Sequence, residues 1–237
     1  MFSFQSRGDR VAIMQPYFFP YLGYFRLLKM VDVMVWLTDV QFPRRGWVHR
    51  NRIRNTNRPN KWQYFGIPVM HAPQKTPISL IKTANDGNWQ TKLSKTLKYN
   101  YSLNTTSTIL RLFTDVIQPP NDLIGDIAKL SITKTCHLLR LDQLTFIDSN
   151  TFKLPQNLTY TDRIFEILSS LKADRYYNLP GGKLLYDRAQ FKKRGIQLHL
   201  LEDMESELNS SSLGMLSVLD PLSRGMISQV TSFLEDE

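Results

Sequence analysis

The sequence contains few of the residues that crosslink chains or bind metals. Its single cysteine excludes an intramolecular disulfide framework and a zinc site made of several cysteines. Cys136 and His137 are adjacent, and neighbours on a helix point about 100° apart, so they cannot form a catalytic dyad there. The histidines show no metal-ligand spacing and stand at positions 49, 71, 137 and 199. We therefore expect no metal site and no thiol-based catalysis.

Long apolar runs are also absent. No run approaches the roughly 20 residues that a membrane-spanning helix needs. The first ten residues, MFSFQSRGDR, lack the apolar centre of a secretory signal. With 237 residues, 42% of them hydrophobic, the chain is long enough to bury a full core. We expect a cytoplasmic protein without a membrane-spanning segment.

Acidic residues are missing from one segment of a chain whose net charge is +9. The cations of this basic segment, 44–61, are Arg44, Arg45, Arg50, Arg52, Arg54, Arg58 and Lys61. Most are arginine, which makes bidentate contacts to phosphates and carboxylates, and Trp47, His49, Asn51 and Trp62 lie among or next to them. The segment therefore predicts a site for an anion: a nucleotide, a sugar-nucleotide pyrophosphate or RNA. The alternative is a basic face that contacts only solvent.

Apolar periodicity predicts alternating strands and helices at both ends of the chain, with helices between. Strands are expected at 10–14, 33–37, 144–149, 175–179 and 196–201, and a short edge strand at 65–69. Helices are expected at 24–32, 88–101, 106–117, 121–141, 161–173, 183–195 and 216–236. The first strand, helix and strand form a βαβ unit. The pattern predicts an α/β fold, a layered and mostly parallel Rossmann-like sheet with a helical insert in the middle of the chain.

We divide the chain into an N-terminal βαβ part with the basic segment (1–77), the helical insert (78–141) and a C-terminal α/β part that completes the same domain (142–237). Helix caps are predicted at Asn121 and at Thr161 or Asp162, and a helix end at Gly195.

In doubly wound sheets, ligands bind beyond the carboxyl ends of the strands. Three polar clusters fall at such ends. They are Gln15 with Tyr17 after the first strand, Thr38 with Asp39 and Gln41 after the second, and Asn178 with Gly181, Gly182 and Lys183 after the fourth. The last cluster opens a predicted helix, so its backbone N–H groups could hold a phosphate or carboxylate. An ordinary βα turn is the alternative.

The tetrapeptide Tyr21-Leu22-Gly23-Tyr24 stands where nucleotidylyltransferases of the HIGH class carry His-x-Gly-His. A phenol can hydrogen-bond an oxyanion but carries no positive charge at neutral pH. A related fold is expected, whereas adenylyl transfer through this motif is not. Alternatively, the aromatic residues pin the loop to the core.

Two residues are candidates for acid–base chemistry. His49 lies inside the basic segment, and Asp39 follows a buried strand directly before it. For Asp39 a structural ion pair with a nearby arginine is the alternative.

Five motifs resemble the WbqC-like family of bacterial O-antigen and surface-polysaccharide biosynthesis. They are IMQPYFFPYLGYF, DVMVWLTDVQF, GWVHRNRI, YYNLPGGKLLYD and LSVLDPLSRG, in family order from about Val11 to Gln229. The positions that match are Gln15, Pro16, Gly23, Tyr24, Asp39, Gln41, Trp47, Arg50, Asn51 and Arg52. The sequence departs from the family at Met14, where members often have His, and at Thr38, where they often have Asp.

The resemblance implies a transferase that adds an acyl or aminoacyl group, of the glycyl type, to a nucleotide-linked amino sugar, as in lipopolysaccharide synthesis. Arg45, Arg50 and Arg52 would bind the pyrophosphate. Asp39 or His49 would accept a proton from the amine, and Gln15, Asn51 and the N–H groups near Gly182 would bind the acyl oxygen. The donor is open between a CoA thioester, an aminoacyl-tRNA and an amino acid with ATP. An RNA- or tRNA-binding module and a non-catalytic scaffold of the glycan pathway are the alternatives.

Overall fold

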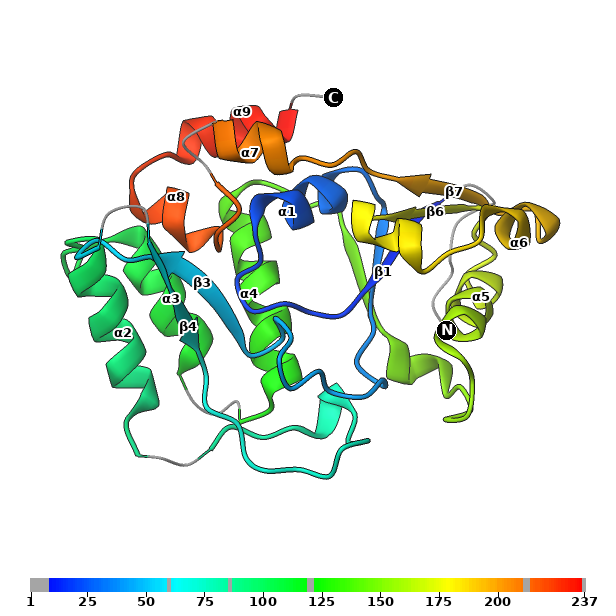
Figure 1. Ribbon diagram of the computed structural model, residues 1–237, viewed down its shortest axis with the longest axis horizontal. Helices are drawn as coiled ribbons and strands as arrows, with labels where there is room; N and C mark the ends of the chain where they lie inside the picture. Colours follow the sequence, from blue (N-terminus) through cyan, green and yellow to red (C-terminus); the bar gives the residue numbers. More distant parts are fainter. Residues whose placement is uncertain (1–8, 59–60, 85–86, 119–121, 211–213, 236–237) are drawn as a thin grey trace. The chain divides into compact units, whose positions relative to one another are not determined.

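The structure is a computed structural model that describes residues 9–58, 61–84, 87–118, 122–210 and 214–235 (Figure 1). The chain divides into two compact units, each treated separately below. The sheet unit comprises the described residues of Met1–Gln15, Gly23–Thr38 and Leu141–Met204. The helical unit comprises those of Pro16–Leu22, Asp39–Arg140 and Glu205–Glu237. The three-part division expected from the sequence stays a prediction.

The sheet unit is built on a parallel sheet of five strands in the order β5-β2-β1-β6-β7. The strands are β1 (Arg10–Met14), β2 (Val33–Trp36), β5 (Thr145–Asp148), β6 (Arg175–Asn178) and β7 (Gln197–Leu200). Counted 1 to 5 along the chain, they stand in the order 3-2-1-4-5, which is that of Rossmann folds. The predicted α/β class and parallel Rossmann-like sheet are confirmed.

The central strands are apolar because both faces of a parallel sheet are covered. In β1 the side chains from Val11 to Met14 are all buried, and so are all four residues of β2. The helical elements of this unit are α1 (Leu22–Lys29), the 3₁₀ helices η2 (Ser149–Phe152) and η3 (Pro180–Leu184), α5 (Tyr160–Ser170) and α6 (Arg188–Lys193).

Two local predictions in the sheet unit were wrong. The cap of α5 is Thr159, whose hydroxyl accepts the backbone N–H of Asp162 at 3.1 Å, because Tyr160 already belongs to the first turn. The single helix predicted over 183–195 is instead η3 followed by α6, because Asp187 adopts extended backbone and caps α6 itself. The predicted end at Gly195 is confirmed, with φ +72° just beyond the C-cap of α6.

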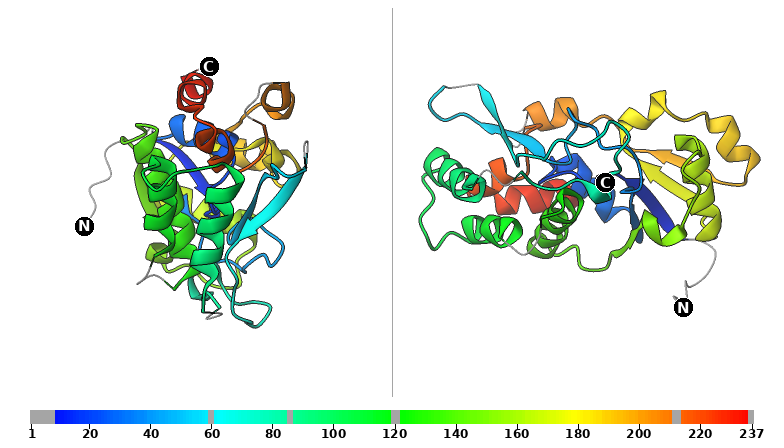
Figure 2. Two further views of the ribbon diagram at one scale, coloured as in Figure 1. Left: turned by 90° about the vertical axis from the view of Figure 1, so that its left-hand side faces the viewer. Right: turned by 90° about the horizontal axis from the view of Figure 1, so that it is seen from below.

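The helical unit packs helices against an antiparallel hairpin. The hairpin is β3 (Arg50–Arg54) with β4 (Trp62–Gly66). The helices are η1 (Ile78–Leu80), α2 (Trp89–Asn100), α3 (Thr108–Ile117), α4 (Ile124–Leu138), α7 (Glu205–Ser210), α8 (Leu219–Ser223) and α9 (Ile227–Glu235). Helix α2 packs on α3, and α3 on α4, as Figure 2 also shows.

The helices of the middle segment are therefore confirmed. The helix predicted over 216–236 is instead α8 followed by α9, because α8 ends with the C-cap Arg224, and neither α7 nor β3 was predicted. The edge strand expected at 65–69 begins and ends earlier, at Trp62 and Gly66, because its partner is β3. The cap predicted at Asn121 lies outside the described residues.

The loop after β1 belongs to the core of the helical unit. Phe18 and Phe19 are fully buried, and both rings contact Phe113 of α3, at centroid distances of 6.4 and 5.6 Å. Phe65 of β4 contacts Phe113 at 5.2 Å. The backbone N–H of Phe19 donates to the hydroxyl of Ser131 in α4. Phe18 and Phe19 thus pin the loop to the core, which is the role that the sequence analysis gave as the alternative for the aromatic residues of this loop.

No helix in the part of the chain that the structure describes is long and apolar enough to cross a membrane.

Candidate functional site

The arginines of β3 lie on one side of the hairpin. Asn51 and Ile53 are buried, whereas Arg50, Arg52 and Arg54 are partly exposed, which is the period of two that a strand imposes. The part of the basic segment that forms β3 therefore has a core face and an arginine face. The side chains of Arg50, Arg52 and Arg54 therefore point to the same side of the hairpin.

Arg54 is neutralised by a buried carboxylate. Its Nε lies 3.4 Å from Oδ1 of Asp220, a side chain in α8 that is fully buried. Tyr101 donates its hydroxyl to the same oxygen at 2.6 Å, and Nε of Arg224 lies 3.2 Å from Oδ2. Burial and the neighbouring carboxylate raise the pKa of Tyr101, so its phenol stays protonated and donates. This cluster connects α8 to β3 and to the residue that follows α2.

Arg50 and Arg52 are held differently. The guanidinium of Arg52 lies 5.2 Å from the ring of Trp47 and 4.9 Å from that of Trp62. That of Arg50 lies 4.4 Å from the ring of Tyr64 and donates to the carbonyl of Arg45 at 2.8 Å. Among the described residues neither arginine is paired with a carboxylate, and the buried Nε of each has no hydrogen-bond partner.

Stacking on aromatic rings fixes a guanidinium without neutralising its charge. Each such contact contributes roughly 0.5–1 kcal/mol at an exposed site. Two ordered and unneutralised guanidinium groups beside each other are suited to bind phosphate or carboxylate oxygens. We call the side formed by Arg50, Arg52, Trp62 and Tyr64 the arginine–aromatic face.

The sequence analysis missed part of this face. Tyr64 was not selected, and Trp62 was noted only as an aromatic residue beside the arginines. Both are exposed, by 54% and 46%, and their rings meet edge to face at 5.1 Å. The signal that could have found them is the period of two shared by Arg50-x-Arg52-x-Arg54 and Trp62-x-Tyr64, which indicates two strands facing the same side.

Asn51 supports the site from the core side of the hairpin. Its amide nitrogen donates to the carbonyls of Phe18 and Phe19, at 3.2 and 2.9 Å, and its amide oxygen accepts the N–H of Arg52 at 2.8 Å. Both N–H groups are therefore committed to the protein. Asn51 positions β3 against the aromatic loop and has no donor left for an acyl oxygen.

The two acid–base candidates lie in the same unit as the arginine–aromatic face. Asp39 is buried. His49 is half-buried, its Nδ1 is buried without a hydrogen-bond partner among the described residues, and its ring lies 5.3 Å from Phe42. Burial, aided by the charge of Arg50, lowers the pKa of His49 to about 4. His49 is thus neutral at physiological pH and can accept a proton, but it is a weak base.

The remaining candidates in the helical unit are Gln41, Tyr17 and Tyr21. Gln41 is exposed and pairs by backbone with Pro77. Tyr17 and Tyr21 are half-buried in the aromatic loop, and burial raises the pKa of the Tyr17 phenol, which therefore stays protonated.

The other predicted residues lie in the sheet unit. Gln15 follows β1, beside β6, at the point where the strand order reverses and where ligands bind in folds of this topology. Its side-chain amide makes no hydrogen bond with the described residues. Gly23 is buried in the first turn of α1, and fully buried Tyr24 donates its hydroxyl to the carbonyl of Gln15 at 3.0 Å. Tyr24 thus has no exposed surface for a ligand.

The glycines after β6 are explained by packing. A Cβ on Gly182 would lie 3.0 Å from the ring of Tyr186 and 3.1 Å from Leu200. The N–H of Gly182 already donates to the carbonyl of Leu179 at 3.0 Å, and η3 is a 3₁₀ turn of five residues. Gly181 and Lys183 are exposed. The geometry matches the βα turn that was the alternative to an anion cradle.

Internal hydrogen bonds occupy the other strand ends of this unit. Asn178 donates to the hydroxyls of Tyr176 and Tyr186, at 2.8 and 3.0 Å, and accepts the N–H of Leu179. At the ends of β2 and β5, Thr38 donates to Asp148 at 2.6 Å, and Asn150 donates to both side chains.

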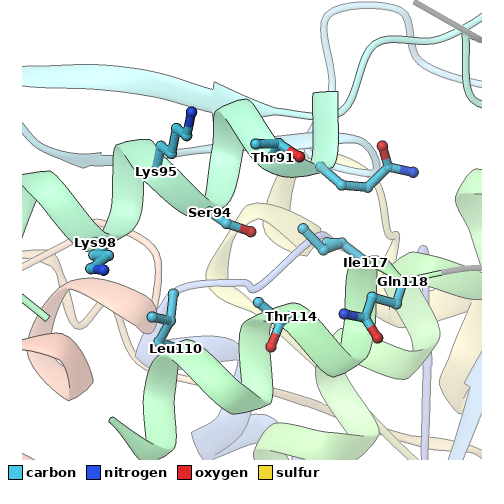
Figure 3. A pocket seen from close by; sticks show the side chains of 9 residues that line it. Thr91, Ser94, Lys95, Lys98, Leu110, Thr114, Ile117 and Gln118 are labelled. Atoms are coloured by element: carbon cyan, nitrogen blue, oxygen red, sulfur yellow. The ribbon is translucent and has the colours of Figure 1, made fainter. Parts of the chain in front are cut away.

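A cavity of about 270 Å³ lies between α2 and α3, where Ser94, Leu110 and Thr114 point into the same space (Figure 3). None of the residues selected from the sequence lines it. Within the described ranges, no group of three or more His, Cys, Asp or Glu side chains could hold a metal ion.

Comparison with known proteins matches residues 15–229 to the WbqC-like protein family. Over 94 residues the chain is 32% identical to "Uncharacterized protein Rv1507c" of Mycobacterium tuberculosis (strain ATCC 25618 / H37Rv). The match covers 39% of the chain and spans 39% of the length of that curated relative. No solved structure matches the chain.

Proposed function

Because the chain belongs to the WbqC-like protein family, we propose that it is a transferase that adds an acyl or aminoacyl group, of the glycyl type, to a nucleotide-linked amino sugar. Family membership suggests a role in polysaccharide biosynthesis. The acceptor, a bacterial surface-glycan precursor of the O-antigen kind, is part of the proposal, as is a cytoplasmic location.

The observation that carries the proposal is the contrast within β3. Arg54 has a buried carboxylate partner, whereas Arg50 and Arg52 have aromatic partners and no carboxylate among the described residues. Leaving two adjacent guanidinium groups unneutralised costs stability through their mutual repulsion, unless an anion joins them. The diphosphate of a sugar nucleotide supplies such an anion, and Arg45 next to them adds a further exposed charge.

In the transfer step, the amine nitrogen of the sugar attacks the acyl carbonyl and a C–N bond forms. The bond from the acyl carbon to its carrier then breaks, and the amine proton passes to a base. Asp39 and His49 are the candidate bases, and both belong to the helical unit that also carries Arg50 and Arg52. The carrier leaves as the thiol of CoA, as the ribose hydroxyl of tRNA or as AMP. In the last case the amino acid must first react with ATP to form an aminoacyl adenylate, which releases pyrophosphate.

The test combines binding and product analysis. The protein is incubated with a panel of amino-sugar nucleotides and the three kinds of donor, and products are identified by mass spectrometry. We expect one acylated sugar nucleotide, and the Arg50→Gln/Arg52→Gln double variant should bind that substrate at least a hundredfold more weakly, because each charge-assisted hydrogen bond contributes about 1.5–3 kcal/mol.

Arg58→Gln is the matched control, because it removes one charge from the same basic segment at an exposed position in the turn between β3 and β4. Its binding should stay within about threefold of the parent protein, since an exposed charge acts only at a distance through screened solvent. Absence of any acylated product together with absence of sugar-nucleotide binding would refute the proposal.

A further inference from the structure

We propose that Trp62 and Tyr64 stack on the nucleobase of a nucleoside diphosphate whose two phosphates bind Arg50 and Arg52. The inference rests on the proposed function, since it assigns the nucleotide part of the substrate to the arginine–aromatic face. It goes further by naming the groups that recognise the base. Nucleotide recognition would then depend on two residues of β4 as well as on the arginines.

The register of the hairpin orders these groups along one direction. Arg50 stands opposite Gly66, Arg52 opposite Tyr64 and Arg54 opposite Trp62. Successive positions on one side of a strand are roughly 7 Å apart. The arginine side chains reach along the hairpin, so that the guanidinium of Arg50 lies over the ring of Tyr64 and that of Arg52 over the ring of Trp62. Each unneutralised cation therefore stands directly beside an exposed ring, and a ligand that combines two phosphates with a planar base matches this pairing of charge and aromatic surface.

The rings are both exposed and ordered. About half of the surface of each is accessible, 46% for Trp62 and 54% for Tyr64. Each ring already packs against a guanidinium and against the other ring, which restricts its rotamers before a ligand arrives. Ordering in advance reduces the entropy lost on binding. Exposed aromatic side chains can stack on any nucleobase, because every base has a π-face.

The arrangement of charge favours one nucleotide over a nucleic-acid strand. A strand places a phosphate at every nucleotide and needs cations along the whole groove. On the outward side of β3, however, Arg54 is already paired with Asp220, and the two unpaired guanidinium groups are adjacent. Gly66 stands opposite Arg50 and has no side chain that could cover it. A Cβ at position 66 would lie only 2.4 Å from Cβ of Arg50. Two adjacent guanidinium groups match the two phosphates of a diphosphate.

The experiment is a calorimetric titration of the full chain with UDP, GDP, ADP and inorganic pyrophosphate. At least one nucleoside diphosphate should bind tenfold or more tightly than pyrophosphate. Trp62→Leu and Tyr64→Leu should each weaken that binding roughly ten- to hundredfold, and should weaken pyrophosphate binding by no more than about fivefold, the part that comes from loss of the cation–π contact to the arginine. Tyr99→Leu is the matched control, because Tyr99 is a 73% exposed aromatic residue of α2 in the same unit, and it should leave both affinities unchanged.

Three results would overturn the inference. One is equal affinity for pyrophosphate and every nucleoside diphosphate, and another is nucleoside-diphosphate binding that the two ring variants leave unchanged. The third is an oligonucleotide that binds more tightly than any nucleoside diphosphate, with an affinity that falls steeply with salt, which would identify a nucleic-acid surface.

Failure of this inference can be told from failure of the proposed function. If Trp62→Leu and Tyr64→Leu form acylated product with an unchanged KM for the sugar nucleotide, base stacking is refuted and the transferase stands. If a nucleoside diphosphate binds with the expected dependence on both rings and no acylated product forms with any donor, the base site stands and the transferase is refuted.

Discussion

The two units of the protein satisfy their polar groups in opposite ways. In the sheet unit, the side chains at the ends of β2, β5 and β6 hydrogen-bond one another, as Asn178 does with Tyr176 and Tyr186. In the helical unit, α8 supplies a carboxylate for Arg54, whereas Arg50 and Arg52 have none among the described residues. A polar group that the fold satisfies internally contributes to stability, and one that the fold orders but leaves unneutralised is available to a ligand. This difference is the reason for proposing the hairpin, and not the sheet edge, as the recognition surface.

The largest effect on stability is expected for Asp220→Asn. This change removes a fully buried charge that faces Arg54, Arg224 and the hydroxyl of Tyr101. Breaking a buried ion pair costs about 3–5 kcal/mol of unfolding free energy, and the side chains of Arg54 and Arg224, which are 39% and 25% exposed, place the expected loss at the lower end, about 3 kcal/mol. Urea denaturation measures the loss. Asp115→Asn, an exposed position on α3, should change stability by less than about 0.5 kcal/mol, and an equal loss in both variants would contradict the assignment.

The sheet unit should respond to Asn178→Ala in stability alone. The change leaves the N–H of Leu179 without its side-chain acceptor and removes the amide donor from the two tyrosine hydroxyls, which keep their hydrogen bond to each other, and this costs about 2–3 kcal/mol. Binding of UDP or pyrophosphate should not change. A matched Gln197→Ala variant, at an exposed position of β7, should be neutral in both measurements. Loss of anion binding by folded Asn178→Ala protein would transfer the recognition surface to the sheet unit and break the comparison.

A smaller effect is expected from adding one methyl group at Gly66. Its Cβ would meet Arg50 at 2.4 Å from Cβ and 2.9 Å from Cα, so the strands must separate or Arg50 must move. We expect a loss of about 1–2 kcal/mol in stability and weaker pyrophosphate binding, read by urea denaturation and calorimetry. Gly181→Ala adds the same methyl group where nothing lies within 4 Å and should change neither property. Unaltered anion binding by Gly66→Ala would show that the position of Arg50 does not matter.

The smallest effect concerns His49 and pH. Burial lowers its pKa from 6.5 to about 4 in the folded protein, so the unfolded chain binds more protons between these values. Stability should therefore fall as pH decreases from about 6.5 toward 4, by about 1 kcal/mol at pH 5 once partial exposure is allowed for. His49→Gln should remove that part of the pH dependence in urea denaturation. His71→Gln, at an exposed site, should retain it, and parallel curves for both variants would contradict the assignment.

Periodic patterns explain why much of the fold could be predicted. The apolar runs of β1 and β2 and the three- and four-residue spacings of α3 and α5 are local signals that tertiary structure did not override. The hairpin was missed because β3 is rich in arginine, and its strand character shows only as a period of two. The N-cap of α5 was misplaced because Thr159, Thr161 and Asp162 all have side chains suited to cap a helix.

The candidate site could be predicted only in part. The sequence identified Arg50 and Arg52 because a cationic run without acidic residues is visible along the chain. Tyr64 could not be selected, because its place opposite Arg52 depends on the register of the hairpin. Asn51 and Tyr24 fit the family motif, but their hydrogen bonds to Phe18, Phe19 and Gln15 assign them to the scaffold.

The sequence by itself determined the α/β class, the parallel order implied by the βαβ unit, the helical middle segment and the concentration of arginine. These follow from local periodicity and composition. Only the tertiary structure decided which arginines are paired with a carboxylate, because the carboxylate that pairs with Arg54 lies 166 residues further along the chain. It also decided that aromatic rings order Arg50 and Arg52, since no local pattern encodes contacts between distant segments.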